Sequence, residues 1–247
     1  AGIRPASKHE GTIGNMMKKL YILIAAILLI LPSSAASTQN QEDAIMIWST
    51  TTIHKTFGKE NNWTVGILSE YRHNFHEGVA KMSQYFVRPS VAYKVLPWMK
   101  LQYQMDFAAH GSKGFQWRFI PEITFSHKVG DFTFAYRQRA MTTWNVKGGT
   151  NSTVLRSRAK IDYRIPKSPV TAHFAFEPYW CDFGNAVNNG FAWFQKARWY
   201  AGVNIKLADH LYFMPQYICQ AYHNHKGRYD RRTYDDHVIY LTLSVKL

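Results

Sequence analysis

The chain has 247 residues and carries 30 Lys and Arg against 16 Asp and Glu, which gives a formal net charge of +14. This length suits a single domain, and two cysteines, Cys181 and Cys219, are too few for the disulfide framework of a small secreted scaffold. A balance this basic commonly indicates a nucleic-acid partner, so its interpretation depends on the compartment in which the protein works.

The N-terminal part predicts export. Residues 16–36 read MMKKLYILIAAILLILPSSAA, in which Lys18 and Lys19 precede an uncharged apolar run that ends in small residues. This order is typical of a cleaved secretory signal peptide, because the run is shorter than the ~20 residues that a spanning helix needs. Residues 1–15 match no part of such a signal. We expect them to be a wrongly assigned upstream start before Met16, or an engineering scar. Export excludes nucleic acid as a partner.

Beyond residue 36 the sequence predicts β-strands. Apolar and polar residues alternate in segments of about ten residues or more, which is the pattern of a transmembrane β-barrel. In 153–165, TVLRSRAKIDYRI, every second residue from Arg156 to Arg164 is charged. A barrel can turn such a face to a wet lumen and the apolar face to lipid. The same alternation, in chain order, runs through 99–107, 117–125, 153–165, 170–180, 199–207 and 237–247.

The connections between these segments fall into two length classes. Short turns at 96–98, 129–131, 166–169 and 208–209 alternate with longer connections at 73–82, 110–114, 145–152, 182–192 and 223–236. Outer-membrane barrels have short periplasmic turns and longer external loops, which assigns the two sides. Residues 62–247 then give an antiparallel up-and-down barrel of ten strands. Residues 37–61 hold one further possible strand at 45–57, and because such barrels have even strand numbers, twelve strands is the alternative.

The charged faces predict a cationic lumen. A narrow barrel is filled by its own side chains, so we expect the inward arginines and lysines to pair with Glu70, Asp106, Glu122, Asp162 and Glu177. The residues predicted to line this lumen are Glu70, Arg72, Arg88, Arg118, Glu122, Arg137, Arg139, Arg156, Arg158, Arg164, Glu177 and Arg198.

Dispersed motifs point to a known family. They include Glu-x-Arg at Glu70 and Arg72, two Arg-x-Arg pairs at 137–139 and 156–158, and FAFEPYW around Glu177, followed by Arg198 and by His237 in the closing segment DDHVIYLTLSVKL. Over about residues 45–247 the chain resembles the bacterial outer-membrane family catalogued as domain of unknown function 2490. The resemblance implies an outer-membrane barrel and no assigned activity.

Two kinds of site are alternatives to the interpretation that these residues simply belong to polar loops. A lipid-modifying barrel enzyme needs a nucleophile, a base and an orienting group, and the sequence offers His110 with Ser112, or Ser126 with His127, but no evident third member. A metal site would draw on His223, His225 and His237 with nearby aspartates. We assign neither a catalytic residue nor a metal or other cofactor.

The sequence therefore predicts an outer-membrane barrel of a Gram-negative bacterium, with a structural role, a surface interaction or slow passage of small anions. The expected partners are outer-membrane lipid, lipopolysaccharide and the barrel-assembly machinery. The alternatives are a lipid-modifying enzyme and a soluble periplasmic β-sandwich that binds a ligand, in which the apolar faces of two sheets would pack together. We expect Cys181 and Cys219 to be reduced, because they fall on strands that are not predicted to be neighbours.

Overall fold

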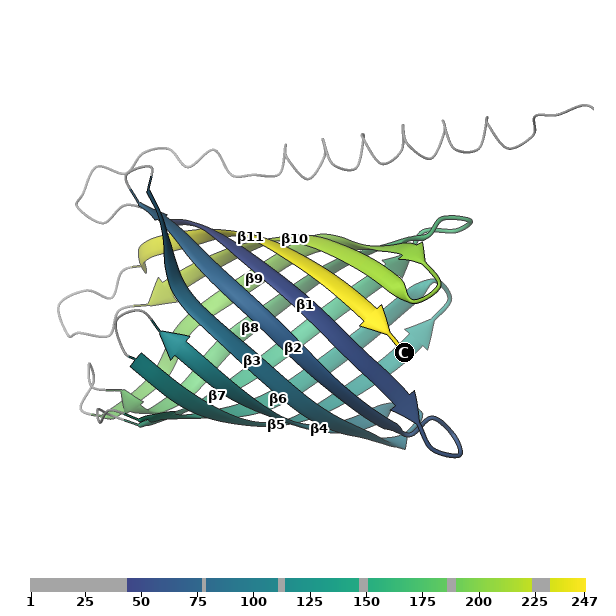
Figure 1. Ribbon diagram of the computed structural model, residues 1–247, viewed down its shortest axis with the longest axis horizontal. Coiled ribbons are helices and arrows are strands. Elements are labelled where there is room, and N and C mark those ends of the chain that lie inside the picture. The colour runs from purple at the N-terminus through teal and green to yellow at the C-terminus, as the bar shows by residue number, and fades with distance from the viewer. Residues whose placement is uncertain (1–43, 77–78, 111–113, 147–150, 186–189, 224–231) are drawn as a thin grey trace, which may run out of the picture. The chain divides into compact units, whose positions relative to one another are not determined.

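The computed structural model describes residues 44–76, 79–110, 114–146, 151–185, 190–223 and 232–247, which form one closed β-barrel (Figure 1). In this described part of the chain, no helix is long and apolar enough to cross a membrane. The eleven strands, in chain order, are β1 (Ala44–Phe57), β2 (Trp63–His76), β3 (Val79–Leu96), β4 (Met99–His110), β5 (Gly114–Val129), β6 (Phe132–Asn145), β7 (Ser152–Arg164), β8 (Val170–Asn185), β9 (Gly190–Ala208), β10 (Leu211–His223) and β11 (Arg232–Lys246).

The predicted up-and-down topology is confirmed, and the predicted number of strands is wrong. Each strand pairs antiparallel with the next, and β1 closes the barrel by pairing with β11 in parallel, from Ala44 opposite Asp236 to His54 opposite Lys246. A barrel that is antiparallel throughout must have an even number of strands. One parallel pair removes that requirement, so the barrel begins at residue 44 and neither ten nor twelve strands is correct.

Each strand presents one apolar face and one polar face, as the alternation predicts. Ile67, Tyr103 and Phe134 are exposed on the outer face, whereas Glu70 and Asp106 are buried inside. Charged side chains therefore fill the interior and large apolar side chains cover the outside, which is the reverse of a soluble protein. The β-sandwich alternative is wrong for the described residues, because their single sheet closes on itself and leaves no second sheet to pack against.

The connections that follow β1, β3, β5, β7 and β9 lie together at one end of the barrel. β1 turns into β2 through 58–62, where the amide of Asn61 donates to the carbonyl of Gly58 at 3.1 Å. The connections after β3, β5, β7 and β9 are equally brief and, because consecutive strands are antiparallel, lie at the same end, where the chain also finishes (Figure 1). We call this the short-turn end.

An apolar cluster occupies part of the interior. Trp48 of β1 packs with Tyr200 of β9, Ile218 of β10 and Val238 of β11, together with Ala175. These side chains come from five strands on one side of the barrel, so they reduce the open space and hold β1 against strands that are distant from it in sequence. The open pocket in the remaining lumen is lined mainly by residues of β1, β2, β3, β4, β6 and β7.

Position 202 of β9 must be a glycine, because two side chains from the neighbouring strands meet across it. His173 of β8 and Gln216 of β10 lie on either side of Gly202 in register, and the His173 Nε2 and Gln216 Oε1 atoms are 3.1 Å apart. A Cβ at position 202 would lie 2.6 Å from the carbonyl oxygen of Pro215 and 2.8 Å from the Cγ of Gln216.

We expect Gly202→Ala to lower the free energy of unfolding by about 3 kcal/mol, because the neighbouring backbone must shift to admit a methyl group. Denaturant unfolding in detergent micelles measures this loss. Ala201→Ser, on the outward-facing neighbour, is the control and is expected to change little. An unchanged unfolding midpoint for Gly202→Ala would show that β9 and β10 are not packed this closely.

Candidate functional site

A pocket of about 540 Å³ lies inside the barrel. It extends from Trp48 and Arg72 to Thr56 and Thr64, which lie beside the short β1–β2 turn. Eight of the described lining residues are Arg or Lys, and Glu70 is the single carboxylate among them. The lining is therefore strongly cationic, and its basic residues are Arg72, Arg88, Lys100, Arg137, Arg139, Arg156, Arg158 and Arg198.

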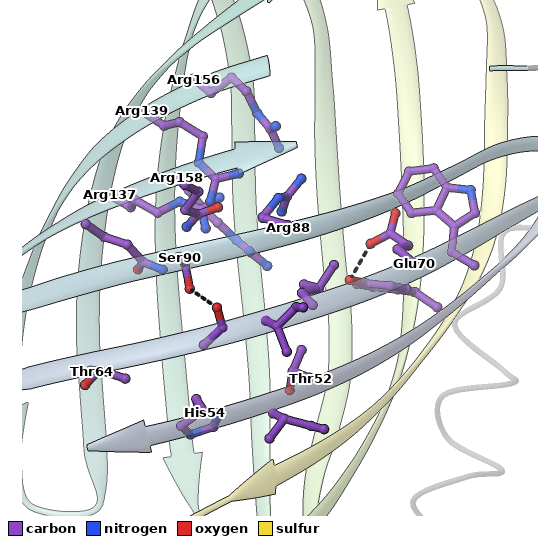
Figure 2. Close-up of a pocket in the computed structure, with 18 of the residues that line it drawn as sticks. Thr52, His54, Thr64, Glu70, Arg88, Ser90, Arg137, Arg139, Arg156 and Arg158 are labelled. Atoms are coloured by element: carbon purple, nitrogen blue, oxygen red, sulfur yellow. Dashed lines mark hydrogen bonds between the residues drawn. The ribbon is translucent and has the colours of Figure 1, made fainter. Parts of the chain in front are cut away.

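Four arginines of the pocket form a square, which we call the arginine quartet: Arg137 and Arg139 of β6, and Arg156 and Arg158 of β7. Arg137 lies directly opposite Arg158 in the strand register, and Arg139 lies opposite Arg156. Figure 2 shows the four side chains gathered on one wall of the pocket. Like charges directly opposite each other destabilise a sheet, so the quartet needs compensation.

Two carboxylates compensate the quartet in part. Arg139 donates to Glu122 of β5 at 2.5 Å. Glu177 of β8 accepts from Arg137 at 2.5 Å and from Arg156 at 2.9 Å, and it also accepts from the Tyr200 hydroxyl at 2.5 Å. Because Glu177 is fully buried, these charge-assisted hydrogen bonds offset its desolvation. Two negative charges thus face four positive ones.

Arg158 is held in a different way from the other three arginines. Its guanidinium lies 4.1 Å from the centre of the Tyr200 ring, and it makes no ion pair with any residue that the structure describes. Stacking on an aromatic face orients a guanidinium without neutralising it. Arg158 therefore contributes to the pocket an oriented positive charge that is not held in a direct ion pair.

Elsewhere in the lumen, the carboxylates are paired. Arg72 donates to Glu70 at 2.5 Å, and Arg88 binds Asp106 through two hydrogen bonds. The other pairs complete a network in which each buried carboxylate has partners: Arg118 with Asp106 at 3.5 Å, Arg198 with Gln220 at 2.5 Å, Gln220 with Asp236 at 2.6 Å, and Lys160 with Asp162 at 2.7 Å. This part of the lumen is filled by paired side chains.

The wall that faces the quartet carries hydroxyl groups beside the charged side chains of Glu70, Arg72 and Arg88. It is built by β1, β2 and β3 and carries Thr52, Thr56, Thr64 and Ser90. The Ser90 hydroxyl donates to the carbonyl of Gly66 at 3.4 Å (Figure 2). The pocket thus combines many guanidinium groups with several hydroxyl groups, an arrangement that suits a small hydrated anion.

The structure places the predicted lumen residues in three positions. Arg164 is exposed at the last position of β7, outside the pocket lining. Arg118, Glu122 and Glu177 are not part of the lining. Glu122 and Glu177 pair with lining arginines, whereas Arg118 pairs with Asp106, which is not a lining residue either. The residues that line the pocket itself are Glu70, Arg72, Arg88, Arg137, Arg139, Arg156, Arg158 and Arg198.

Sixteen of the lining residues were not among the predicted ones, and Lys100, Trp48 and Tyr200 show why. Lys100 was placed on a polar strand face by its alternation, and that parity was sufficient to find it. Trp48 was missed because its strand was left out of the barrel. Tyr200 was placed on the polar face of its strand, but its contact with Arg158 joins β7 to β9, which are not adjacent, so no local pattern reports it.

The residues weighed for other chemistry do not assemble into a described site. Ser112 lies outside the described residues, and Ser126 and His127 are neighbours on a strand, so their side chains point to opposite faces. The Tyr217 hydroxyl lies 2.5 Å from Nδ1 of His237, whereas His225 lies outside the described residues. Within the described ranges no three His, Cys, Asp or Glu side chains group as metal ligands, and neither Cys181 nor Cys219 forms a disulfide bond there.

Comparison with known proteins gives a family match and a fold likeness. The family described as "Protein of unknown function (DUF2490)" matches residues 45–231. No curated protein matches the chain. Among solved structures, the chain is similar to the NanC porin in a rhombohedral crystal form, with a TM-score of 0.49 and 12% sequence identity over 82% of this chain and 99% of that one.

Proposed function

The chain belongs to the DUF2490 family, and we propose that it is a Gram-negative outer-membrane barrel, exported by a cleaved signal peptide, whose lumen binds small anions and lets them pass slowly. The observation that carries this proposal is the arginine quartet, in which four guanidinium groups face two carboxylates. Like charges placed in register weaken a sheet, so their retention favours a role in binding rather than in folding.

The outer surface supports a membrane location. Large apolar side chains from every side of the barrel are exposed, among them Ile67, Leu101, Phe134, Phe174 and Leu243. Water disfavours such a surface, whereas a closed barrel in lipid satisfies all its backbone hydrogen bonds internally. Lipid and lipopolysaccharide on the outside, and the barrel-assembly machinery during insertion, are the partners that this location implies.

The interior of the barrel favours slow passage of anions. A ring of charged side chains lining a pore selects ions of the opposite sign, and the pocket lining has an excess of positive charge. Inside the barrel, Phe86, Ile120, Ile218 and Val238 are all fully buried, and so is Asp106. Side chains therefore fill much of the cross-section, which favours slow passage over a wide channel.

Two measurements test the proposal. Outer-membrane fractionation followed by a cold detergent gel is expected to give a band that runs faster unheated than boiled, as stable barrels do. Purified protein in liposomes is then expected to release trapped chloride faster than trapped potassium. Extraction without detergent, with no mobility shift on heating, would end the membrane proposal. Release of potassium ahead of chloride would end the anion proposal.

A further inference from the structure

We propose that Arg158 is the recognition residue of an oxyanion site, so that the pocket binds carboxylate and phosphate groups in preference to halide ions. This inference rests on the proposed function, since the anion must reach the lumen, and it names the class of ligand. It follows from how Arg158 is held, from the donors that surround it and from the carboxylate that the same wall already binds.

The quartet has hydrogen-bond donors without acceptors. The Nε atoms of Arg137, Arg156 and Arg158 are buried and have no hydrogen-bond partner among the described residues, and the same holds for the indole Nε1 of Trp48. Trp48 is only 4% exposed and lines the same pocket. A buried donor without an acceptor is costly, and these atoms expose almost no surface, so they add positive potential to the wall without themselves contacting a ligand.

The wall already shows which ligand chemistry it suits. Arg137 and Arg156 each donate to the carboxylate of Glu177, and so does the hydroxyl of Tyr200. The same Tyr200 ring supports Arg158 from its face. The groups that surround Arg158 therefore bind an oxyanion that belongs to the protein, and Arg158 is the member of the quartet left without one.

The geometry of a guanidinium makes the preference specific. Its planar N–H groups match two oxygen atoms of one carboxylate or phosphate, whereas a spherical halide uses one contact at a time. Stacking on Tyr200 fixes the plane of Arg158 before any ligand arrives, so little side-chain freedom is lost on binding. A lysine at this position would keep the charge and lose the paired donors.

Isothermal titration calorimetry on the purified full barrel in detergent tests this inference, with inorganic phosphate, acetate and chloride compared at constant ionic strength. We expect the wild-type protein to bind phosphate and acetate more tightly than chloride. Arg158→Lys is expected to lower the affinity for phosphate and for acetate by roughly tenfold, because one charge-assisted hydrogen bond is lost. The affinity for chloride is expected to stay unchanged. Arg164→Lys, at the exposed end of the same strand, is the matched control and should behave as the wild type.

The outcomes separate this inference from the proposed function. Equal affinities for phosphate, acetate and chloride in the wild type would overturn oxyanion recognition, and so would an Arg158→Lys variant that keeps its oxyanion preference. Anion-selective passage that survives in Arg158→Lys would still support the proposed function. Comparing the phosphate and acetate arms decides which acid group the pocket prefers.

Discussion

Replacing Glu177 by Gln is expected to lower the free energy of unfolding by about 3–5 kcal/mol, the largest loss among the substitutions considered. Gln keeps the size of the side chain and removes its charge. Glu177 is fully buried and accepts hydrogen bonds from Arg137, Arg156 and Tyr200. Without the carboxylate, the quartet keeps only Glu122 as a counter-charge, and four arginines repel one another inside the barrel.

The temperature at which the folded band disappears from a cold detergent gel, together with unfolding in denaturant, measures this loss. Glu60→Gln, in the exposed β1–β2 turn, removes the same charge from the surface and is expected to change little. Adding Arg156→Gln to Glu177→Gln should recover part of the stability, because one unpaired cation is removed. A Glu177→Gln variant as stable as the wild type would show that the quartet is not held by this carboxylate.

Replacing both Arg137 and Arg158 by Gln is expected to abolish most of the anion preference of the barrel. The two residues lie opposite each other on β6 and β7 and both line the pocket. Removing a charge changes the energy of an ion about 4 Å away by roughly 1 kcal/mol even in water, which corresponds to roughly fivefold in the permeability ratio for each charge.

The double variant should still fold, because Glu122 keeps the hydrogen bond from Arg139, and Glu177 keeps those from Arg156 and Tyr200. The zero-current potential across a planar bilayer under a potassium chloride gradient measures the effect, and Arg164→Gln is the control of equal chemistry outside the pocket. An unchanged potential in the double variant would mean that ions do not pass the quartet.

Period-two alternation predicted most of the fold, because it reports directly which face of a strand meets water. It placed Arg156 and Arg158 inside and Phe174 and Trp199 outside, as the structure has them. It failed at β1, where the alternation was seen but the strand was set aside to keep an even count. Parallel pairing between the two ends of the chain depends on closure of the whole sheet, and no local pattern carries that information.

The site was predictable in composition and not in arrangement. The alternation along each strand is sufficient to predict that these arginines and carboxylates face one lumen. Which charges remain unpaired depends on contacts across the barrel. Trp48 of β1 lies under Arg72 at 4.0 Å and under Arg198 of β9 at 5.0 Å, and Arg158 lies over Tyr200. Arg164 was wrongly predicted to line the lumen. Its position in the alternation is that of an inward-facing residue, but it lies exposed at the end of its strand.

The zero-current potential of the wild-type barrel under a potassium chloride gradient tests the central claim most directly, because it reports the sign of the charge that controls passage. The uncompensated arginines predict a potential displaced toward the chloride equilibrium value. A potential displaced toward the potassium value, or bilayers that stay silent with folded, heat-modifiable protein present, would contradict a lumen that passes anions.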